Sequence, residues 1–336
     1  MTSPNTMRAL MVEQAGAPFT AVTLPAPVAG PGQVLVRIAA SGVNPLDTKI
    51  RAGAAGHAKQ PLPAILGIDL AGTIVAVGRD AGDFRVGDEV YGAAGGVGGL
   101  QGTLAELAAV DHRLLARKPG NLTMREAAAL PLAVITAWEG LVDRAAVAVG
   151  QKVLVHGGAG GVGHVAVQLA KALGAEVYTT VSSDQFDIAT GYGAHPIDFR
   201  ATSVQQYVDE FTAGEGFDVV YDTVGGATLD ASFVAVRRYG GHVVSILGWG
   251  THSLAPLSFR AATYSGVFTL LPMTTGRGRE HHGDILRQAA ALVEAGKLLP
   301  LMDKSVFTLD SALQAHQLIE AGQARGKVVI DVAATA

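Results

Sequence analysis

The chain contains no cysteine, few aromatic residues and little charge. Of its 336 residues none is cysteine, 6% are aromatic and 16% are charged. Without thiolates the chain can form neither a disulfide bond nor a cysteine-ligated metal site. The formal net charge of −4 is small, so electrostatics gives no reason to expect nucleic acid or an anionic membrane as a partner.

Long hydrophobic runs are also absent. No run reaches the ~20 apolar residues of a membrane-spanning helix. Residues 1–6 are polar and lack the apolar core of a secretory signal. Hydrophobic residues nevertheless make up 49% of the chain, which is enough for a large core, and the length predicts about two domains. We therefore expect a cytoplasmic protein that binds no membrane.

Glycine is abundant, with 43 residues in total. The densest group lies between an apolar run at 153–155, typical of a buried strand, and a helical pattern that starts near Val162. Gly158, Gly160 and Gly163 match G-x-G-x-x-G, in which the glycines allow a tight turn, admit a pyrophosphate and let helix and strand pack closely. Free N–H groups at the helix start favour phosphate. We predict a dinucleotide site made by Gly158, Gly160, Gly161, Val162 and Gly163.

A nucleoside triphosphate site is disfavoured at this turn. A P-loop would continue with lysine and then serine or threonine, whereas His164 and Val165 stand here. A second glycine-rich segment at 95–99 is followed by a strand pattern at 103–110 and not by a helix. We interpret that segment as a mobile loop that lines the binding cleft.

The pattern along the chain predicts an α/β protein with two domains. Strand-like runs separated by turns indicate a β-rich N-terminal domain, at 8–12, 33–40, 72–77 and 86–91. After helical stretches at 125–130 and 135–141, strands alternate with helices and predict a doubly wound, parallel, six-stranded sheet, at 152–156, 176–181, 196–198, 218–221, 242–247 and 266–271. Helices at 284–295 and 311–320 and a strand at 327–332 follow. We expect a dinucleotide-binding domain at 128–272 and a β-rich domain at 1–127 completed by 273–336.

Several motifs occur in an order typical of one enzyme family. They are Ser41-Gly42-Val43-Asn44-Pro45-Leu46-Asp47, Gly67-Ile68-Asp69-Leu70-Ala71-Gly72, Val86-Gly87-Asp88-Glu89-Val90-Tyr91-Gly92, Asp222-Thr223-Val224-Gly225-Gly226 and Arg325-Gly326-Lys327-Val328-Val329. With the glycine turn they span nearly the whole chain, which resembles the zinc-free branch of the medium-chain dehydrogenase/reductase family, the quinone oxidoreductases and zeta-crystallin-like proteins. The resemblance implies a GroES-like catalytic domain, a Rossmann domain and an active site between them. It also implies a homodimer in which the last Rossmann strand, an edge strand, pairs with its symmetry mate.

The resemblance also bears on metal binding. As the resemblance implies, zinc-dependent relatives have a cysteine ligand at the position of Asn44 and a histidine ligand at the position of Ile68. Asn44 is a poor zinc ligand and Ile68 is none, and Asp69 alone cannot supply the three protein ligands that a catalytic zinc needs. The pair His281-His282 is predicted to lie in a solvated polar loop. We expect no zinc and no other metal.

The nucleotide preference depends on the residues after the second Rossmann strand. An NAD site usually has an acidic residue there, whereas this strand ends at Ser182-Ser183, which leaves room for a 2′-phosphate. Arg200 follows the third strand and either reaches that phosphate or is an exposed loop arginine. Phe186 stands where many NADP-dependent relatives carry a basic residue, and a small shift in register would make Asp184 the ribose acceptor. We predict NADP(H), with NAD(H) as the alternative.

The predicted chemistry is hydride transfer without metal assistance. Strong polarisation of a carbonyl by zinc is not expected, so the acceptor must already be electrophilic. NADPH reducing a quinone is our first hypothesis, and reduction of the C=C bond of an enoyl group or 2-alkenal is the alternative. A non-catalytic dinucleotide-binding protein is a third hypothesis, because a cofactor fold alone does not establish catalysis.

Four residues are predicted at the catalytic centre. Family position places Asn44 and Thr136 at the nicotinamide end; otherwise Asn44 begins a turn before proline and Thr136 bonds its own helix backbone. Asp47 and Lys49 form either a proton relay or a solvated surface pair. Some relatives carry a tyrosine in the following loop, and the chain lacks it, so Lys49, His57 or water would protonate the product.

Further cofactor contacts are predicted at the ends of the last Rossmann strands. Gly248 and Trp249 follow the fifth strand, at the edge of the sheet where ligands bind. Phe268 and Leu270 belong to the predicted sixth strand. Trp249, Phe268 and Leu270 either line the nicotinamide or substrate pocket or pack as ordinary apolar side chains.

Overall fold

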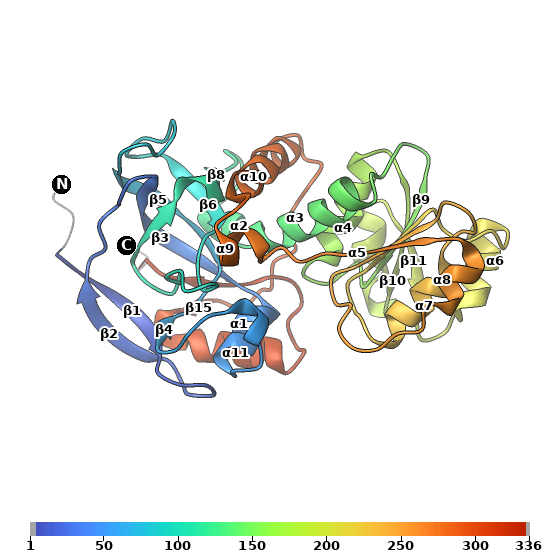
Figure 1. Ribbon diagram of the computed structural model, residues 1–336, viewed down its shortest axis with the longest axis horizontal. Coiled ribbons are helices and arrows are strands. Elements are labelled where there is room, and N and C mark those ends of the chain that lie inside the picture. Colours follow the sequence, from blue (N-terminus) through green and yellow to red (C-terminus); the bar gives the residue numbers. More distant parts are fainter. Residues whose placement is uncertain (1–4, 334–336) are drawn as a thin grey trace. The chain divides into compact units, whose positions relative to one another are not determined.

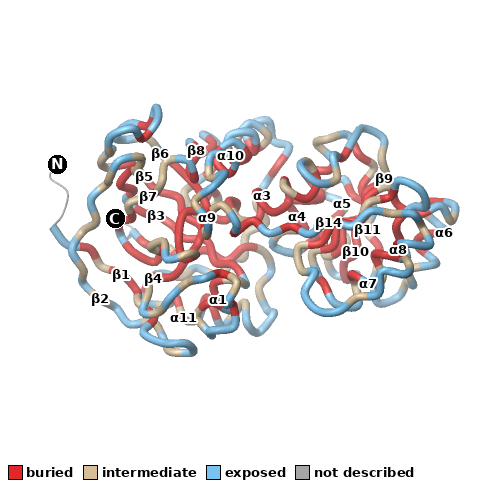
Figure 2. Tube along the Cα trace, in the orientation of Figure 1, coloured by how far each residue is buried: buried red, intermediate tan, exposed pale blue. Residues whose placement is uncertain are grey.

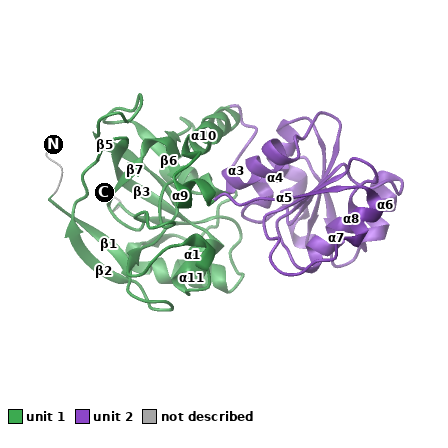
Figure 3. Cartoon of the chain, in the orientation of Figure 1, with its two compact units in different colours: residues 1–132, 270–294, 300–336 green, residues 133–269, 295–299 purple. Residues whose placement is uncertain are grey.

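The computed structural model describes residues 5–333 and divides the chain into two compact units (Figure 3). Unit 1 comprises Met1–Leu132, Leu270–Glu294 and Pro300–Ala336, and unit 2 comprises Ala133–Thr269 and Ala295–Leu299. Unit 1 is therefore assembled from three separate stretches of the chain. Among the described residues, no helix has the length and apolarity that crossing a membrane requires.

Unit 1 is a β-rich domain with two sheets (Figure 1). The larger sheet contains β3 (Gln33–Val43), β5 (Asp69–Val77), β6 (Glu89–Ala93), β7 (Leu107–Asp111), β8 (Leu115–Arg117), β15 (Phe307–Thr308) and β16 (Val328–Asp331). Its order is β15-β16-β3-β5-β6-β8, and β7 also pairs with β3. The smaller sheet contains β1 (Thr6–Val12), β2 (Thr20–Pro25) and β4 (Ala64–Ile65), in the order β2-β1-β4. β16 comes from the C-terminal stretch, so this part of the chain completes the domain.

Residues 5–333 also place five α-helices in unit 1. They are α1 (Pro45–Arg51), α2 (Met124–Ala128), α9 (Leu271–Thr275), α10 (Arg279–Glu294) and α11 (Ala312–Glu320). α2 contacts β3, β5 and β16, α10 contacts β8, and α1 contacts α11. Alternating apolar side chains of β1, β3, β5 and β7 form one hydrophobic core with residues of α11 and β16.

Unit 2 is a doubly wound α/β domain. Its strands are β9 (Lys152–His156), β10 (Glu176–Val181), β11 (His195–Asp198), β12 (Val219–Asp222), β13 (His242–Ser245) and β14 (Thr263–Gly266). Every pairing is parallel, in the order β11-β10-β9-β12-β13-β14. The predicted fold class, a GroES-like domain plus a six-stranded Rossmann sheet, is confirmed.

Helices cover both faces of this sheet. The α-helices of unit 2 are α3 (Pro131–Trp138, whose first two residues belong to unit 1), α4 (Gly163–Ala172), α5 (Phe186–Gly191), α6 (Val204–Thr212), α7 (Ala227–Ala235) and α8 (Ala255–Arg260). α6, α7 and α8 bury apolar side chains against one face, which includes Val220. The next residue, Tyr221, points to the opposite face, where its hydroxyl donates to the Thr136 carbonyl oxygen at 2.8 Å. Most residues of β9, β10, β12, β13 and α4 are buried, whereas β14 has no buried residue. Figure 2 shows the distribution of buried residues along the chain.

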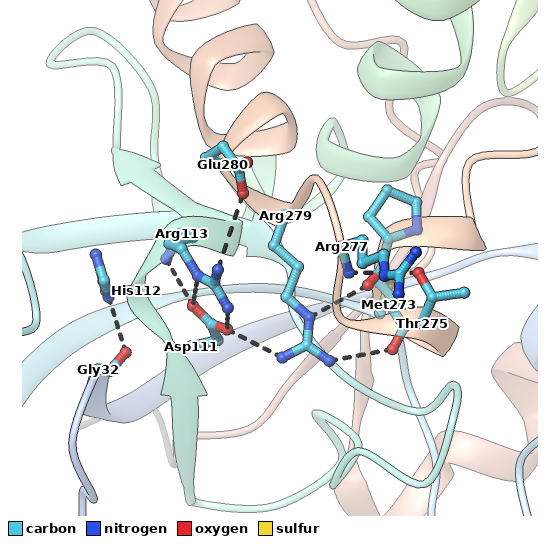
Figure 4. A network of polar contacts seen from close by, with 10 residues as sticks. Gly32, Asp111, His112, Arg113, Met273, Thr275, Arg277, Arg279 and Glu280 are labelled. Atoms are coloured by element: carbon cyan, nitrogen blue, oxygen red, sulfur yellow. Dashed lines mark hydrogen bonds and ion pairs between the residues drawn. The ribbon is translucent and has the colours of Figure 1, made fainter.

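An ion-pair network anchors the chain where it returns to unit 1 (Figure 4). Arg279, the first residue of α10, donates to Asp111 Oδ2 at 2.9 Å and to the Met273 carbonyl oxygen at 3.1 Å. Arg113 forms a second ion pair with Asp111. Burial raises the pKa of Asp111, but the hydrogen bonds from Arg113 and Arg279 outweigh it and bring the pKa to about 2. The network thereby ties α9 and the start of α10 to the end of β7.

Two sequence predictions about local structure are wrong. The sixth Rossmann strand was expected at 266–271, but β14 is Thr263–Gly266, so Phe268 and Leu270 lie beyond it. The apolar run extends into the segment before α9, and hydrophobicity alone did not mark the end of the strand. His281 and His282 were expected in a solvated loop, but both lie in α10, and His282 is buried.

Gly42 tests the packing of α2 against β3. An ideal Cβ at Gly42 would lie 2.1 Å from the carbonyl oxygen of Ala128, which is backbone and cannot move independently. We expect Gly42→Ala to lower the free energy of unfolding by about 1–3 kcal/mol, measured by chemical denaturation. Gly191→Ala is the control, since nothing lies within 4 Å of its Cβ, and alanine in a helix is favoured by up to about 1 kcal/mol. Equal stability of Gly42→Ala and wild type would contradict the packing.

Candidate active site

The predicted glycine turn joins β9 to α4, and its glycines serve different purposes. Gly157 has φ +74°, a left-handed conformation that favours glycine. A Cβ at Gly158 would lie 2.0 Å from Thr179 Oγ1, and a Cβ at Gly163 would lie 2.0 Å from the Gly157 carbonyl oxygen. These three glycines are therefore required by the turn and by the close packing of β9, β10 and α4.

Gly160 and Gly161 form the exposed part of the turn. A Cβ at Gly160 would make one tight contact, with the Gly157 carbonyl oxygen at 3.0 Å, so packing constrains this glycine less than it does Gly158 and Gly163. No acceptor within residues 5–333 is recorded for the backbone N–H groups of Gly161 and Val162. His164 holds the turn, because its backbone N–H and its ring Nδ1 both donate to the Gly160 carbonyl oxygen, at 3.1 and 2.9 Å. The arrangement leaves free N–H groups at a helix start, where anions bind.

Residues at the ends of β10 and β11 lie where an adenosine ribose is predicted. The Ser182 hydroxyl donates to the Asp184 carboxylate, whereas Ser183 is exposed. Val181 of β10 pairs with Asp198 of β11. Ser183 comes two residues after Val181, and the exposed Arg200 comes two residues after Asp198, so each follows the carboxyl end of one of two neighbouring strands. The Arg200 guanidinium lies 5.2 Å from the ring centre of Phe199.

The position where NADP-dependent relatives were expected to carry a basic residue is part of the core. Phe186 packs against a small buried cluster that contains Ala159, Val181 and Ala189. Its side chain packs against the glycine turn, because Ala159 belongs to that turn. Phe186 therefore supplies packing at this place and no charge.

Sequence reasoning missed a buried polar group at the carboxyl ends of β9 and β12. His156 Nδ1 lies 3.0 Å from Thr180 Oγ1, and no hydrogen-bond partner of its Nε2 occurs among the described residues. Burial lowers the pKa of His156 to about 4, although the charge of Asp222 opposes this. Asp222 accepts hydrogen bonds from the backbone of Gly225 and from the Ser245 hydroxyl. The imidazole is therefore neutral near pH 7. His156, Thr180 and Asp222 are far apart in the sequence, and the pairing of their strands brings them together.

The other residues predicted to lie near the cofactor differ in their burial and in the side chains that they contact. A Cβ at Gly248 would lie 2.2 Å from the Tyr264 hydroxyl, so packing alone accounts for this glycine. Trp249 is half exposed, and its ring meets the Phe268 ring edge to face with a centroid distance of 6.5 Å. Thr136 is buried, and its carbonyl oxygen is bound by a tyrosine hydroxyl. In unit 1, Leu270 is buried.

In unit 1, four polar side chains form a buried group that we name the Asn44 cluster. It consists of Asn44, Asp47, Asp69 and Lys327, each at most 4% exposed. Asn44 Nδ2 donates to Asp69 Oδ2 at 2.9 Å, and Lys327 Nζ donates to Asn44 Oδ1. The backbone N–H of Asn44, the residue before α1, donates to Asp47 Oδ2 at 2.8 Å. Asp69 Oδ1 accepts from the backbone N–H of Leu132 at 2.9 Å.

Burial sets the ionisation of the Asn44 cluster. Burial raises the pKa of Asp47 to about 7, with the charge of Asp69 adding to the effect, while the Asn44 backbone hydrogen bond and Lys327 oppose it. Burial raises the pKa of Asp69 to about 6, against the opposing charge of Lys327. Burial also lowers the pKa of Lys327. Two carboxylates thus share one ammonium, and the cluster takes up a proton near neutral pH because an excess buried charge is costly.

Lys49 and His57, which the sequence also placed near the catalytic centre, are not members of this cluster. Lys49 is exposed on α1, and no ion pair between Asp47 and Lys49 occurs within residues 5–333. His57 lies in a short 3-10 turn, Gly56–Ala58. The structure therefore joins Asp47 to Asn44, Asp69 and Lys327, and leaves Lys49 at the surface.

Comparison with known proteins identifies the family. Residues 30–120 match the family described as alcohol dehydrogenase GroES-like domain, and residues 192–330 match the family described as zinc-binding dehydrogenase. Human quinone oxidoreductase is 30% identical, over 98% of this chain and 99% of that protein. The chain belongs to the medium-chain dehydrogenase/reductase family.

Other members of the medium-chain dehydrogenase/reductase family are also similar. The 2-methylene-furan-3-one reductase of Solanum lycopersicum is 38% identical, over 89% of this chain and 71% of that protein. The chloroplastic NADPH-dependent alkenal/one oxidoreductase of Arabidopsis thaliana is 35% identical, over 89% and 72%. An alcohol dehydrogenase superfamily protein from Novosphingobium aromaticivorans has a structure with a TM-score of 0.95 and 57% identity, covering 97% of this chain and all of that one.

The donor set in this medium-chain dehydrogenase/reductase does not fit zinc. Within the described part of the chain, no three histidine, aspartate or glutamate side chains are grouped closely enough to hold a metal ion. Ile68 is a buried apolar residue, and the Asn44 carbonyl oxygen faces the Lys327 ammonium.

Asp47→Asn tests the ionisation of the cluster. Because the pKa of Asp47 is about 7 in the folded protein and 3.8 ordinarily, the folded state keeps a proton that the unfolded state releases between those pH values. The free energy of unfolding of wild type therefore falls as pH rises through this window. Relative to wild type, Asp47→Asn should gain roughly 2–4 kcal/mol between about pH 4 and pH 7.

Denaturation curves across this pH range measure the difference. Lys49→Gln, a change at an exposed position of the same helix, is the control and should differ from wild type by the same amount at every pH. A difference between Asp47→Asn and wild type that does not vary with pH would contradict the buried, proton-binding state of Asp47.

Proposed function

We propose that this chain is a zinc-independent reductase that uses NADPH to reduce a quinone or a similar activated acceptor. The exposed glycine turn before α4 carries this proposal, because Gly160 and Gly161 are exposed and the N–H groups of Gly161 and Val162 are free. The composition of the site fits a pyrophosphate, which needs close approach to the backbone and N–H donors. The names of the relatives support the reaction class.

In this proposal, Gly160, Gly161 and Val162 bind the pyrophosphate. Gly158 and Gly163 shape the turn, and His164 holds it by fixing the Gly160 carbonyl oxygen. Bound NADPH would supply the hydride. The partial positive charge at the start of α4, a helix of ten residues, favours the phosphates.

Ser183 and Arg200 are proposed to bind the 2′-phosphate of NADPH. Both are exposed and follow paired positions of β10 and β11. Asp184, the competing ribose acceptor of an NAD site, already accepts the hydroxyl of Ser182. The Arabidopsis relative is named as NADPH-dependent, which supports NADPH over NADH.

Asn44 is proposed to donate a hydrogen bond to the oxygen of the acceptor. Negative charge develops on this oxygen as the hydride arrives, and a preorganised donor stabilises it. Asp47 is proposed as the group that stores a proton for the product, since it binds one near neutral pH. The nicotinamide and substrate end of the site is still predicted to include Lys49, Thr136, Gly248, Trp249, Phe268 and Leu270.

A second candidate activity is reduction of an activated C=C bond. The tomato and Arabidopsis relatives, named for furanone and alkenal/one substrates, are 38% and 35% identical to this chain, against 30% for human quinone oxidoreductase. The chemistry demanded of the protein is the same, because an enolate oxygen and a hydroquinone oxygen both need a hydrogen-bond donor.

We propose that the protein is a homodimer. β14 is an edge strand of the unit 2 sheet, and unpaired edges are ready to bind another strand. Large apolar side chains near it are exposed, among them Phe259 at 85% and Tyr239 at 81%. A symmetry-related β14 would pair with this edge and cover part of the apolar surface.

An acceptor panel tests the proposed function. Oxidation of NADPH is followed at steady state with a small quinone, a 2-alkenal and an enoyl thioester, after calorimetric titration with NADPH and NADH. We expect tighter binding of NADPH and turnover of at least one acceptor, and the preferred acceptor decides between the two activities. Tight binding without turnover of any acceptor would overturn the proposal in favour of a non-catalytic dinucleotide-binding protein.

Gly160→Val tests the phosphate turn. The branched side chain would fill the space through which the pyrophosphate approaches the backbone. Its Cβ would also press on the Gly157 carbonyl oxygen at 3.0 Å, so circular dichroism and thermal unfolding are measured on the variant to show that it is folded. We expect the affinity for NADPH to fall at least about 100-fold, equivalent to about 2.7 kcal/mol. Gly56→Val, at an exposed glycine of unit 1 with nothing within 4 Å, should bind NADPH as wild type does. Unchanged affinity in a folded Gly160→Val would refute the assignment.

A further inference from the structure

The Asn44 cluster joins residues that are far apart in the sequence. Pairing of β16 with β3 brings Lys327, the residue before β16, beside Asn44, the residue after β3. Pairing of β3 with β5 brings Asp69 to the same end of the sheet. All four members are buried, so their hydrogen bonds are made in a medium of low dielectric, where they are strong.

The partners of Asn44 determine which way its amide points. An ammonium has only donors, so Lys327 Nζ must face the amide oxygen, and an ionised carboxylate has only acceptors, so Asp69 must face the amide nitrogen. The opposite orientation would place two donors together and two acceptors together. One N–H of the Asn44 amide is used by Asp69, and no acceptor for the second is recorded among residues 5–333.

The positive charge of Lys327 also affects how well the Asn44 amide donates a hydrogen bond. Without the ammonium, Asp47 and Asp69 would place up to two negative charges beside Asn44 and would oppose the charge that grows on a reduced oxygen. With the ammonium the amide oxygen is polarised, which makes the N–H groups better donors. Arg125 of α2, which packs on the same strands, is paired with Asp331 at 2.6 Å, so Lys327 is the cation that faces the cluster.

We propose that Lys327 is a positioning residue, whose ammonium holds the Asn44 amide so that its second N–H is presented to the oxygen of the acceptor. The inference rests on the proposed function, in which Asn44 binds that oxygen. Asp69 acts from the other side by fixing the amide nitrogen. Lys327 itself touches neither acceptor nor cofactor in this proposal, and its effect passes through Asn44.

A double-mutant cycle tests whether Lys327 acts through Asn44. Lys327→Met keeps the length of the side chain and removes the charge, and we expect kcat to fall roughly 100-fold, as for loss of an oxyanion donor, with the calorimetric affinity for NADPH unchanged. Asn44→Ala should have a similar effect. The combined variant should be no slower than Asn44→Ala alone, because the ammonium has nothing left to orient. Multiplicative losses in the combined variant would overturn the proposal.

A charge-balanced variant guards against loss of folding. Lys327→Met alone leaves two buried carboxylates without a cation, whereas Lys327→Met combined with Asp69→Asn restores the balance and keeps an oxygen acceptor for Asn44. We expect the same loss of kcat in this balanced variant. A balanced variant with the kcat of wild type would overturn the proposal.

The side-chain amide of Asn44 gives a readout that does not need turnover. Its two N–H signals in a ¹⁵N–¹H spectrum are assigned by their disappearance in Asn44→Ala. We expect them to exchange slowly with solvent in wild type and at least about tenfold faster in the balanced variant. Equal exchange in both proteins would overturn the role of Lys327. A wild type that reduces no acceptor would instead overturn the proposed function, and the spectrum would still decide how the amide is held.

Discussion

Two carboxylates buried in the β-rich unit depend on one ammonium. Asp47 and Asp69 are buried. The cation that balances them, Lys327, is 283 positions along the chain from Asn44, the residue that it binds. A buried charge without a partner costs several kcal/mol, so the pairing of β16 with β3 has an electrostatic as well as a hydrophobic basis. The end of the sheet that carries Asn44 is therefore held by the last described strand of the protein.

In the turn of unit 2, packing constrains the glycines to different degrees. Gly158 and Gly163 are glycine because neighbouring atoms leave no space for a side chain, whereas Gly160 is exposed and is constrained by a single contact. Gly160, which packing constrains less than it does Gly158 and Gly163, lies beside the free N–H groups, as an anion-binding turn requires. The proposed cofactor site thus includes a glycine that intramolecular packing explains only in part.

Local patterns in the sequence were sufficient for most of the fold. Runs of apolar residues bounded by glycine predicted β9 at 152–156 and β10 at 176–181, which the structure confirms. The sixth strand was misplaced because the apolar run continues past its end at Gly266. The histidine pair was assigned to a loop because its neighbours are polar, although one side of α10 buries His282. Periodicity identifies an element more reliably than it locates its end.

The candidate site was predictable only in part, for a physical reason. Asn44 and Asp47 stand close together in the sequence and belong to one motif, so both were predicted. Lys327 was noticed only as part of a motif, and Asp69 only as an insufficient zinc ligand. Their roles arise from strand pairing over more than 20 residues in one case and nearly the whole chain in the other. Such pairings leave no periodic mark in a single sequence.

The discontinuity of unit 1 has a consequence for biosynthesis. Unit 2 is nearly contiguous, from Ala133 to Thr269, and can form its sheet while the ribosome is still adding later residues. Unit 1 must wait for β16, because residues 40–43 of β3 pair with it. Until Asp331 emerges, that stretch of β3 is an open edge, with two carboxylates nearby and no ammonium. The β-rich unit therefore remains incomplete until β16 has been synthesised, and its unpaired edge is open to pairing with other strands during that interval.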